Sequence, residues 1–158
     1  MRVFSIFLLF FINTATAEEI KYREPFTLNL PIDSQYYYQE AFEKIPYVYQ
    51  NVVFLFVNEN FGINISKNEN SEVSYEKDIK KADIEFSLTQ QLIEQNITMI
   101  MVIKNNTNQT LYLEGLMTVP NKKSVMKTTM LPVRPGMSNI ESWPHPIIQI
   151  ALRNIRLE

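Results

Sequence analysis

Cysteine is absent from this chain of 158 residues, and histidine and tryptophan each occur only once. Without cysteine no disulfide can form, so a small exported domain of this composition must rely on its hydrophobic core for stability. The same absence excludes a thiol nucleophile and a lipid-modified cysteine at the N-terminus. The sequence therefore excludes stabilisation by disulfides and catalysis by a cysteine.

The sequence does not indicate a catalytic serine either, because no G-x-S-x-G motif occurs and no serine has a recognised arrangement with His145. Acidic residues are scattered along polar faces and loops, so a hydrolase with a carboxylate pair is an alternative without a specific motif. We therefore expect no catalytic residues, no cofactor and no enzymatic activity.

A basic stripe is also missing. The chain has 15 Lys and Arg residues against 17 Asp and Glu residues, for a formal net charge of −2 at pH 7. The two signs are interspersed, so no surface is expected to follow a phosphate backbone. We expect no nucleic-acid partner.

The first 17 residues have the pattern of a cleaved signal peptide. Arg2 precedes the apolar run Val3–Ile12, and Ala15 and Ala17 supply the small residues that signal peptidase requires. The apolar run has about ten residues, half of the roughly twenty that a membrane-spanning helix needs. We therefore expect cleavage after Ala17, a single domain over residues 18–158 without a membrane span, and a periplasmic or secreted location. An uncleaved anchor is the alternative.

Beyond this leader, hydrophobic residues follow the two-residue period of β-strands. Phe26–Leu30 and Ile84–Leu88 alternate with polar residues, as in strands with one buried face. Val52–Val57 is apolar throughout, which is typical of a strand covered on both faces, and Ile97–Ile103 is again a continuous apolar run. Further strands are predicted over 111–119, 125–131 and 147–157.

Turn residues separate these segments. Lys104–Thr110 and Pro120–Lys123 are predicted to be hairpin loops, and Pro135-Gly136 has the sequence of a type II turn. A bulge is predicted at Glu114-Gly115, and a change of apolar face predicts another near Arg153-Asn154.

Helix is predicted only over Gln35–Lys44, with a further short turn within Tyr75–Ala82. The whole pattern predicts an all-β fold, an antiparallel two-sheet β-sandwich that is immunoglobulin-like in broad architecture and has one or two short helices. A small open β-barrel is the alternative.

Methionine and the single histidine gather in the C-terminal half, and thioether and imidazole groups both bind soft Cu(I) well. Met137 and His145 lie closest in sequence, so they are the candidate metal ligands, together with a neighbouring methionine. No H-x-M or M-x-x-x-H motif occurs, however. Adaptable filling of the core is therefore the preferred interpretation of the methionines, and no metal site is predicted.

Aromatic residues form a second cluster, with Tyr36, Tyr37 and Tyr38 consecutive in sequence. Three adjacent rings cannot all point into one core, because successive side chains point in different directions. Tyrosine and tryptophan are enriched in binding hot spots, so these tyrosines and Trp143 are the candidate partner-binding residues. A tyrosine-rich flap over the sandwich is the structural alternative.

These features together predict a non-catalytic, exported, protein-binding β-sandwich, such as an accessory or adaptor subunit of a bacterial envelope, secretion or surface-assembly system. Its partner would be another envelope or exported protein. A periplasmic copper carrier that uses Met and His is one alternative, and an immunity-type inhibitor is another. Edge strands, with Phe26–Leu30 as a candidate, also offer a route to a homo-oligomer.

Overall fold

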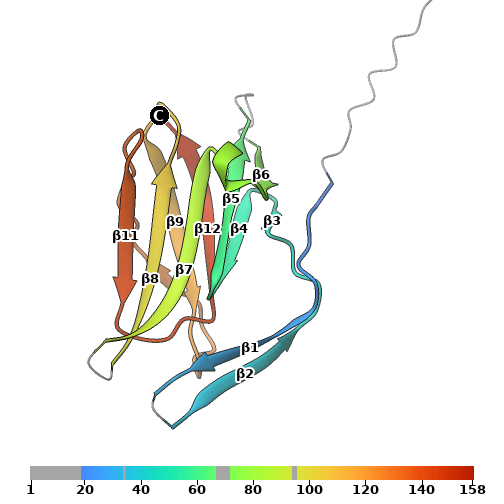
Figure 1. The fold of residues 1–158 in the computed structure, drawn as a ribbon, viewed down its shortest axis with the longest axis vertical. Helices are drawn as coiled ribbons and strands as arrows, with labels where there is room; N and C mark the ends of the chain where they lie inside the picture. The colour runs from blue at the N-terminus through green and yellow to red at the C-terminus, as the bar shows by residue number, and fades with distance from the viewer. Residues whose placement is uncertain (1–18, 34, 67–71, 94–95) are drawn as a thin grey trace, which may run out of the picture.

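The structure is a computed structural model that describes residues 19–33, 35–66, 72–93 and 96–158. The predicted leader and its cleavage site lie outside these residues. Most of the described strands belong to two antiparallel sheets that pack face to face (Figure 1). The β-sandwich predicted from the sequence is confirmed. No described strand is shared between the two sheets, so they do not close into a barrel.

Each of the two sheets has five strands. The first, named the β12 sheet, has the order β10 (Met126–Thr128), β9 (Leu111–Thr118), β12 (Gln149–Leu157), β4 (Val52–Phe56) and β3 (Val48–Tyr49). The second, named the β8 sheet, has the order β11 (Ser138–Trp143), β8 (Asn96–Asn105), β7 (Ile84–Ile93), β5 (Glu59–Ile65) and β6 (Val73–Glu76). The 3₁₀ turn η1 (Ile79–Lys81) lies within the segment predicted to form a short turn.

The core lies between the sheets and is built from alternate residues of each strand. On β8, Met99 and Met101 are fully buried, whereas Ile100 between them is half-buried on the outer face. Burial alternates in the same way at the start of β4, where Val53 is buried and Phe54 is half-buried. Both apolar runs therefore contain strands with one buried face and one partly exposed apolar face, not strands covered equally on both sides.

The predicted helix over Gln35–Lys44 is wrong, because this segment contains strand β2 (Tyr37–Phe42), which pairs with β1 (Phe26–Pro31). The Asp33 carboxylate accepts backbone hydrogen bonds from Gln35 and Tyr36 and so shapes the connecting turn. The hairpin lies across one end of the sandwich (Figure 1). Tertiary contacts of its apolar residues thus override a local helical preference.

Two turn predictions and one bulge prediction are confirmed. β9 and β10 pair across the Pro120–Lys123 loop. At Pro135-Gly136, the glycine has φ +68°, and the Met137 N–H donates to the Arg134 carbonyl at 3.1 Å. The pairing of β12 with β9 shifts register between Arg153 and Arg156, where Asn154 has φ 53°.

Two other local predictions are wrong. Lys104–Thr110 is not a hairpin loop, because β8 and β9 belong to different sheets and the segment crosses between them. β9 runs through Gly115 without a shift in register. The glycine is needed there because a Cβ atom would lie 2.6 Å from Thr128 Cγ2 and closer still to Met130 Cε. Close approach of β10, not a bulge, explains this residue.

No helix of the described residues is long and apolar enough to span a membrane.

Candidate functional site

The three consecutive tyrosines take different positions on the β1–β2 hairpin. Tyr36 ends the turn and is 65 % exposed, and Tyr37 begins β2 and is 67 % exposed. Tyr38 points the other way and packs against the hydrophobic core. The expectation that at least one ring leaves the core is confirmed, and the structure identifies two such rings.

Tyr38 is held on the inner side by a hydrogen bond from its hydroxyl to the Glu40 carboxylate. Burial of the ring, together with this carboxylate, raises the pKa of Tyr38 to about 12. The phenol therefore stays neutral and acts as a donor at any physiological pH. Of the three tyrosines, Tyr38 is the one that anchors the hairpin.

The hairpin is fastened to the sandwich at both ends. Near the turn, the Gln90 side chain of β7 donates to the Pro31 carbonyl at 2.7 Å. At the other end, the ring of Phe26 lies 5.3 Å from that of Phe42, and both contact Phe56 of β4 at centroid distances of 5.2 and 5.0 Å. The exposed tyrosines are consequently carried by a supported element.

A pocket of about 440 Å³ opens beside Tyr37, between the hairpin and the end of β7. Its lining is mainly uncharged: Pro31, Asp33, Tyr37, Gln90, Gln91, Leu92 and Ile97. Leu92 is 70 % exposed, the most exposed apolar side chain of this lining. We name the set of Tyr36, Tyr37 and Leu92 the tyrosine surface.

Sequence reasoning missed Leu92. It has the same alternation as the buried residues Ile84, Phe86 and Leu88, so a period of two predicts that it is buried. It is exposed because it lies near the end of β7, four residues beyond the fully buried Leu88.

Two other tyrosines of the N-terminal half, Tyr47 and Tyr75, are structural. Tyr47 stacks on Tyr75 with 4.2 Å between ring centroids, and the guanidinium of Arg23 lies 4.0 Å above the Tyr47 ring. Burial raises the pKa of Tyr75, and the adjacent Tyr47 adds to the effect. These rings are part of the packing around a buried cation.

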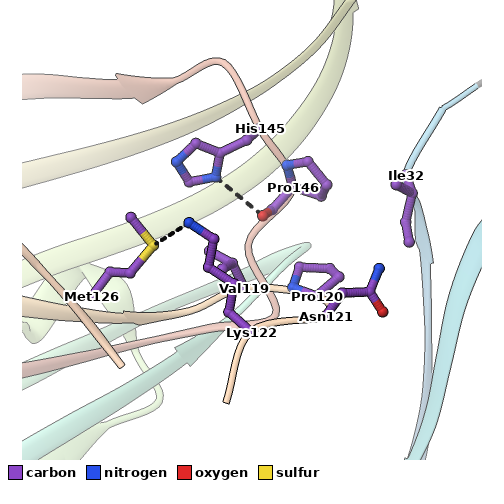
Figure 2. Close-up of a pocket in the computed structure, with 8 residues that line it drawn as sticks. All are labelled: Ile32, Val119, Pro120, Asn121, Lys122, Met126, His145 and Pro146. Carbon is purple, nitrogen blue, oxygen red and sulfur yellow. Dashed lines mark hydrogen bonds between the residues drawn. The ribbon is translucent and has the colours of Figure 1, made fainter. Parts of the chain in front are cut away.

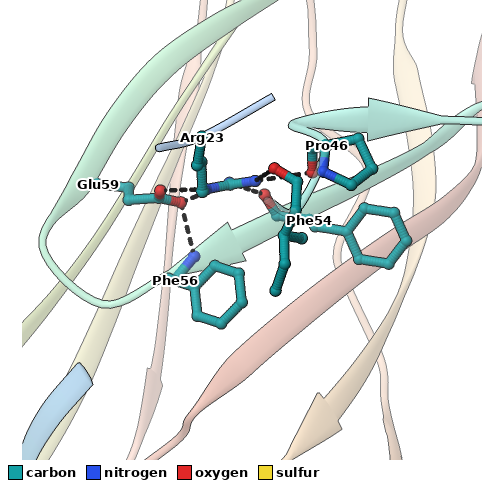
Figure 3. A network of polar contacts seen from close by, with 6 residues as sticks. Arg23, Pro46, Phe54, Phe56 and Glu59 are labelled. Atoms are coloured by element: carbon teal, nitrogen blue, oxygen red, sulfur yellow. Dashed lines mark hydrogen bonds and ion pairs between the residues drawn. The ribbon is translucent and has the colours of Figure 1, made fainter. Parts of the chain in front are cut away.

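That cation, Arg23, is the centre of a buried polar network (Figure 3). Its guanidinium binds both carboxylate oxygens of Glu59 and donates to the carbonyls of Pro46 and Phe54. Glu59 in turn accepts the Phe56 N–H at 2.8 Å. Every charged group here is satisfied within the protein, so the network fixes the N-terminal segment instead of offering a free charge to a ligand.

Trp143 ends β11 and packs partly against the core. Its indole N–H donates to the Thr128 hydroxyl of β10 at 3.2 Å. Since β11 and β10 are edge strands of opposite sheets, this bond joins the two sheets along one side. Trp143 is therefore not part of the tyrosine surface.

The structure does not bring Met137 and His145 together. Met137 precedes β11 and His145 follows it, so they lie near opposite ends of a strand whose six residues extend over about 20 Å. His145 instead shares a pocket of about 290 Å³ with Met126 (Figure 2). Its Nδ1 faces the Pro146 carbonyl at 3.3 Å, and the Lys122 ammonium lies 3.6 Å from the Met126 sulfur.

Of the remaining methionines, Met99, Met101, Met117 and Met130 are buried in the core. Within the part of the chain that the structure describes, no group of three or more His, Asp or Glu residues could hold a metal ion.

No family model matches this chain, and no curated protein and no solved structure shows significant similarity to it.

Proposed function

We propose that this chain is an exported, non-catalytic β-sandwich that binds another protein through the tyrosine surface. The observation that carries the proposal is that the consecutive residues Tyr36 and Tyr37 are 65 % and 67 % exposed. Tyr37 also lines a pocket together with the exposed Leu92. The free energy falls when a partner covers a large apolar side chain that was exposed to water, so such side chains favour binding.

The support beneath this surface favours binding as well. Tyrosine has few rotatable bonds, and the hairpin is fixed by Gln90 and by aromatic contacts, so little order has to be imposed when a partner docks. The phenol hydroxyls offer hydrogen bonds at the rim of the contact. The partner is another envelope or exported protein, and the chain serves as an accessory or adaptor subunit of an envelope, secretion or surface-assembly system. An immunity-type inhibitor would use the same surface.

The test is capture of a partner from a periplasmic extract by tagged protein, followed by comparison of Tyr36→Ala and Tyr37→Ala with Tyr49→Ala. Tyr49 lies on β3 and is 45 % exposed, so it controls for the loss of an exposed ring elsewhere. Truncation of a hot-spot tyrosine costs about 2 kcal/mol, which weakens binding roughly 30-fold.

The melting temperature should stay the same in all three variants, because none of these rings is buried. Equal capture by the wild type, Tyr36→Ala and Tyr37→Ala would show that the binding surface lies elsewhere.

The second candidate function is soft-metal transport, which the shared pocket of His145 and Met126 favours. If Nδ1 donates to the Pro146 carbonyl, the Nε2 lone pair is free for a metal. The Lys122 ammonium beside the Met126 sulfur opposes cation binding, so we rank this function second.

Titration with Cu(I) under reducing conditions tests the metal function. Stoichiometric binding that is lost in both His145→Ala and Met126→Leu, and kept in Met137→Leu, would support it. Binding that is insensitive to these substitutions would reject this site.

A further inference from the structure

β11 is an edge strand of the β8 sheet, and among the described strands it pairs with β8 alone. The other edge strands of the sandwich are short: β3 has 2 residues, β10 has 3 and β6 has 4, whereas β11 has 6. Short edge strands protect a sheet against unwanted pairing. β11 lacks this protection.

The direction of the β11 backbone groups follows from one hydrogen bond. The Asn105 N–H donates to the Met137 carbonyl at 2.9 Å, so position 137 faces β8. In an antiparallel pair the facing residues alternate, so the N–H and C=O groups of Ser138, Ile140 and Ser142 point away from β8. Within the described residues, these groups have no hydrogen-bond partner.

The side chains along this edge do not protect it either. Ser138, Ile140 and Ser142 are all exposed, with Ile140 at 71 %, and none of them is charged. The alternate residues, Asn139 and Glu141, bind the backbone of Leu131 at 3.1 and 3.2 Å. They hold β11 to the neighbouring segment.

We propose that β11 is a self-association site, at which two copies of this chain pair their β11 strands antiparallel about a two-fold axis through Ile140. The sequence S-N-I-E-S carries this choice of partner, because it is almost symmetric about Ile140. The two-fold axis places Ser138 opposite Ser142 of the second copy and Ile140 opposite its own counterpart.

Each of these opposed positions can exchange two backbone hydrogen bonds with the second copy, because all three residues direct their groups to the open edge. Asn139 lies opposite Glu141, a donor amide against a carboxylate, and no like charges are directly opposed. Ile140 also lies beside Val102 of β8, so the two copies form one apolar row across the joined sheets. An unrelated strand would not require this symmetry.

The test measures the mass of the purified protein beginning at Glu18, which contains every described residue, by sedimentation at concentrations from about 1 to 100 µM. We expect a dimer. Ile140→Lys should raise its dissociation constant more than 10-fold, because it places two like charges at the axis. Ser142→Pro should do the same, because it removes an N–H that points away from β8, at an edge where proline is tolerated. Val125→Lys is the matched control, since Val125 is 57 % exposed and directly precedes β10 of the other sheet.

Crosslinking gives a second measurement, because the natural chain has no cysteine. Cα atoms of a hydrogen-bonded antiparallel pair are about 5.5 Å apart, within the range of a disulfide. Ile140→Cys should therefore oxidise to a covalent dimer much faster than Val125→Cys. A wild-type monomer at all concentrations, a dimer that neither Ile140→Lys nor Ser142→Pro weakens, or equal oxidation of the two cysteine variants would overturn the proposal. None of these outcomes bears on the tyrosine surface.

Discussion

At the scale of single residues, Asn105 is a polar side chain that is fully buried, yet each of its polar atoms has a hydrogen-bond partner. Its amide nitrogen donates to the carbonyls of Gln109 and Val133 at 2.7 and 2.9 Å, and its oxygen accepts from Thr107. Buried polar groups are costly unless they are paired in this way. The residue fixes the crossover between the two sheets.

Asn106, its neighbour, is exposed but is also engaged. Its amide donates to the Ala82 carbonyl at 3.0 Å and to Glu85 at 2.8 Å. Burial alone would raise the pKa of Glu85, but the hydrogen bonds from Asn106 and Lys104 outweigh that effect and hold the pKa below its ordinary value. The ionised carboxylate therefore stabilises the fold above the pKa of the unfolded chain, and this contribution is lost as the pH falls.

We predict that Asn106→Asp lowers the free energy of unfolding by about 1–2 kcal/mol at pH 7, because it removes two donors and adds a second carboxylate beside Glu85. The deficit should shrink below about pH 4, where both carboxyl groups take up protons. Urea unfolding at pH 7 and pH 3.5 measures both effects. Asn108→Asp, in the same loop, is the control and should be close to neutral. A neutral Asn106→Asp would contradict the importance of these bonds.

The Arg23–Glu59 pair gives a larger expected effect. Arg23→Met leaves the Glu59 carboxylate without its charge partner in a site where Arg23 itself is 4 % exposed. Loss of one member of a buried pair costs about 3–5 kcal/mol. Lys21→Met removes a cation from the exposed pair with Glu19 and should have no measurable effect on thermal unfolding. Similar melting temperatures for the two variants would show that the buried network is dispensable.

At the scale of elements, β8 has two faces of different importance. Met101 is fully buried, and the adjacent Ile100 lies on the outer face. A continuous apolar run in the sequence conceals this difference, because periodicity cannot distinguish two apolar faces.

We predict that Met101→Asp abolishes soluble expression, since it places an unpaired charge in the core. Ile100→Asp should still fold and lose less than about 2 kcal/mol, because water reaches that face. The yield of soluble protein and its denaturation midpoint test the pair. If Ile100→Asp is the more damaging substitution, the outer face of β8 is covered by something else.

At the scale of the whole molecule, we predict that the protein is exported and that its signal peptide is removed. Every described strand lies between residues 26 and 157, within the domain predicted over residues 18–158. We expect the exported protein to begin at Glu18. Intact-mass measurement tests this, and replacement of Ala17 with a bulky residue should leave the precursor uncleaved. A secreted protein that still carries Phe10 or Phe11 would contradict the predicted cleavage site.

The sequence by itself determined the features that depend on neighbouring residues. The period of two placed β1 and β7, and a continuous apolar run placed β8. The Pro135-Gly136 pair located a turn with positive φ, and the change of apolar face located the register shift after Arg153. The strands β3, β5, β6 and β11 were not predicted.

Tertiary structure decided the features that depend on distant partners. Gln35–Lys44 contains a strand because β1 and Phe56 offer pairing and burial. Lys104–Thr110 crosses between sheets because β9 pairs with β12 and not with β8. Distant parts of the fold also decide that Tyr37 and Leu92 are exposed. They likewise decide that Met137 lies far from His145. A period in the sequence fixes which residues share a face, but the elements that pack nearby decide whether that face is buried.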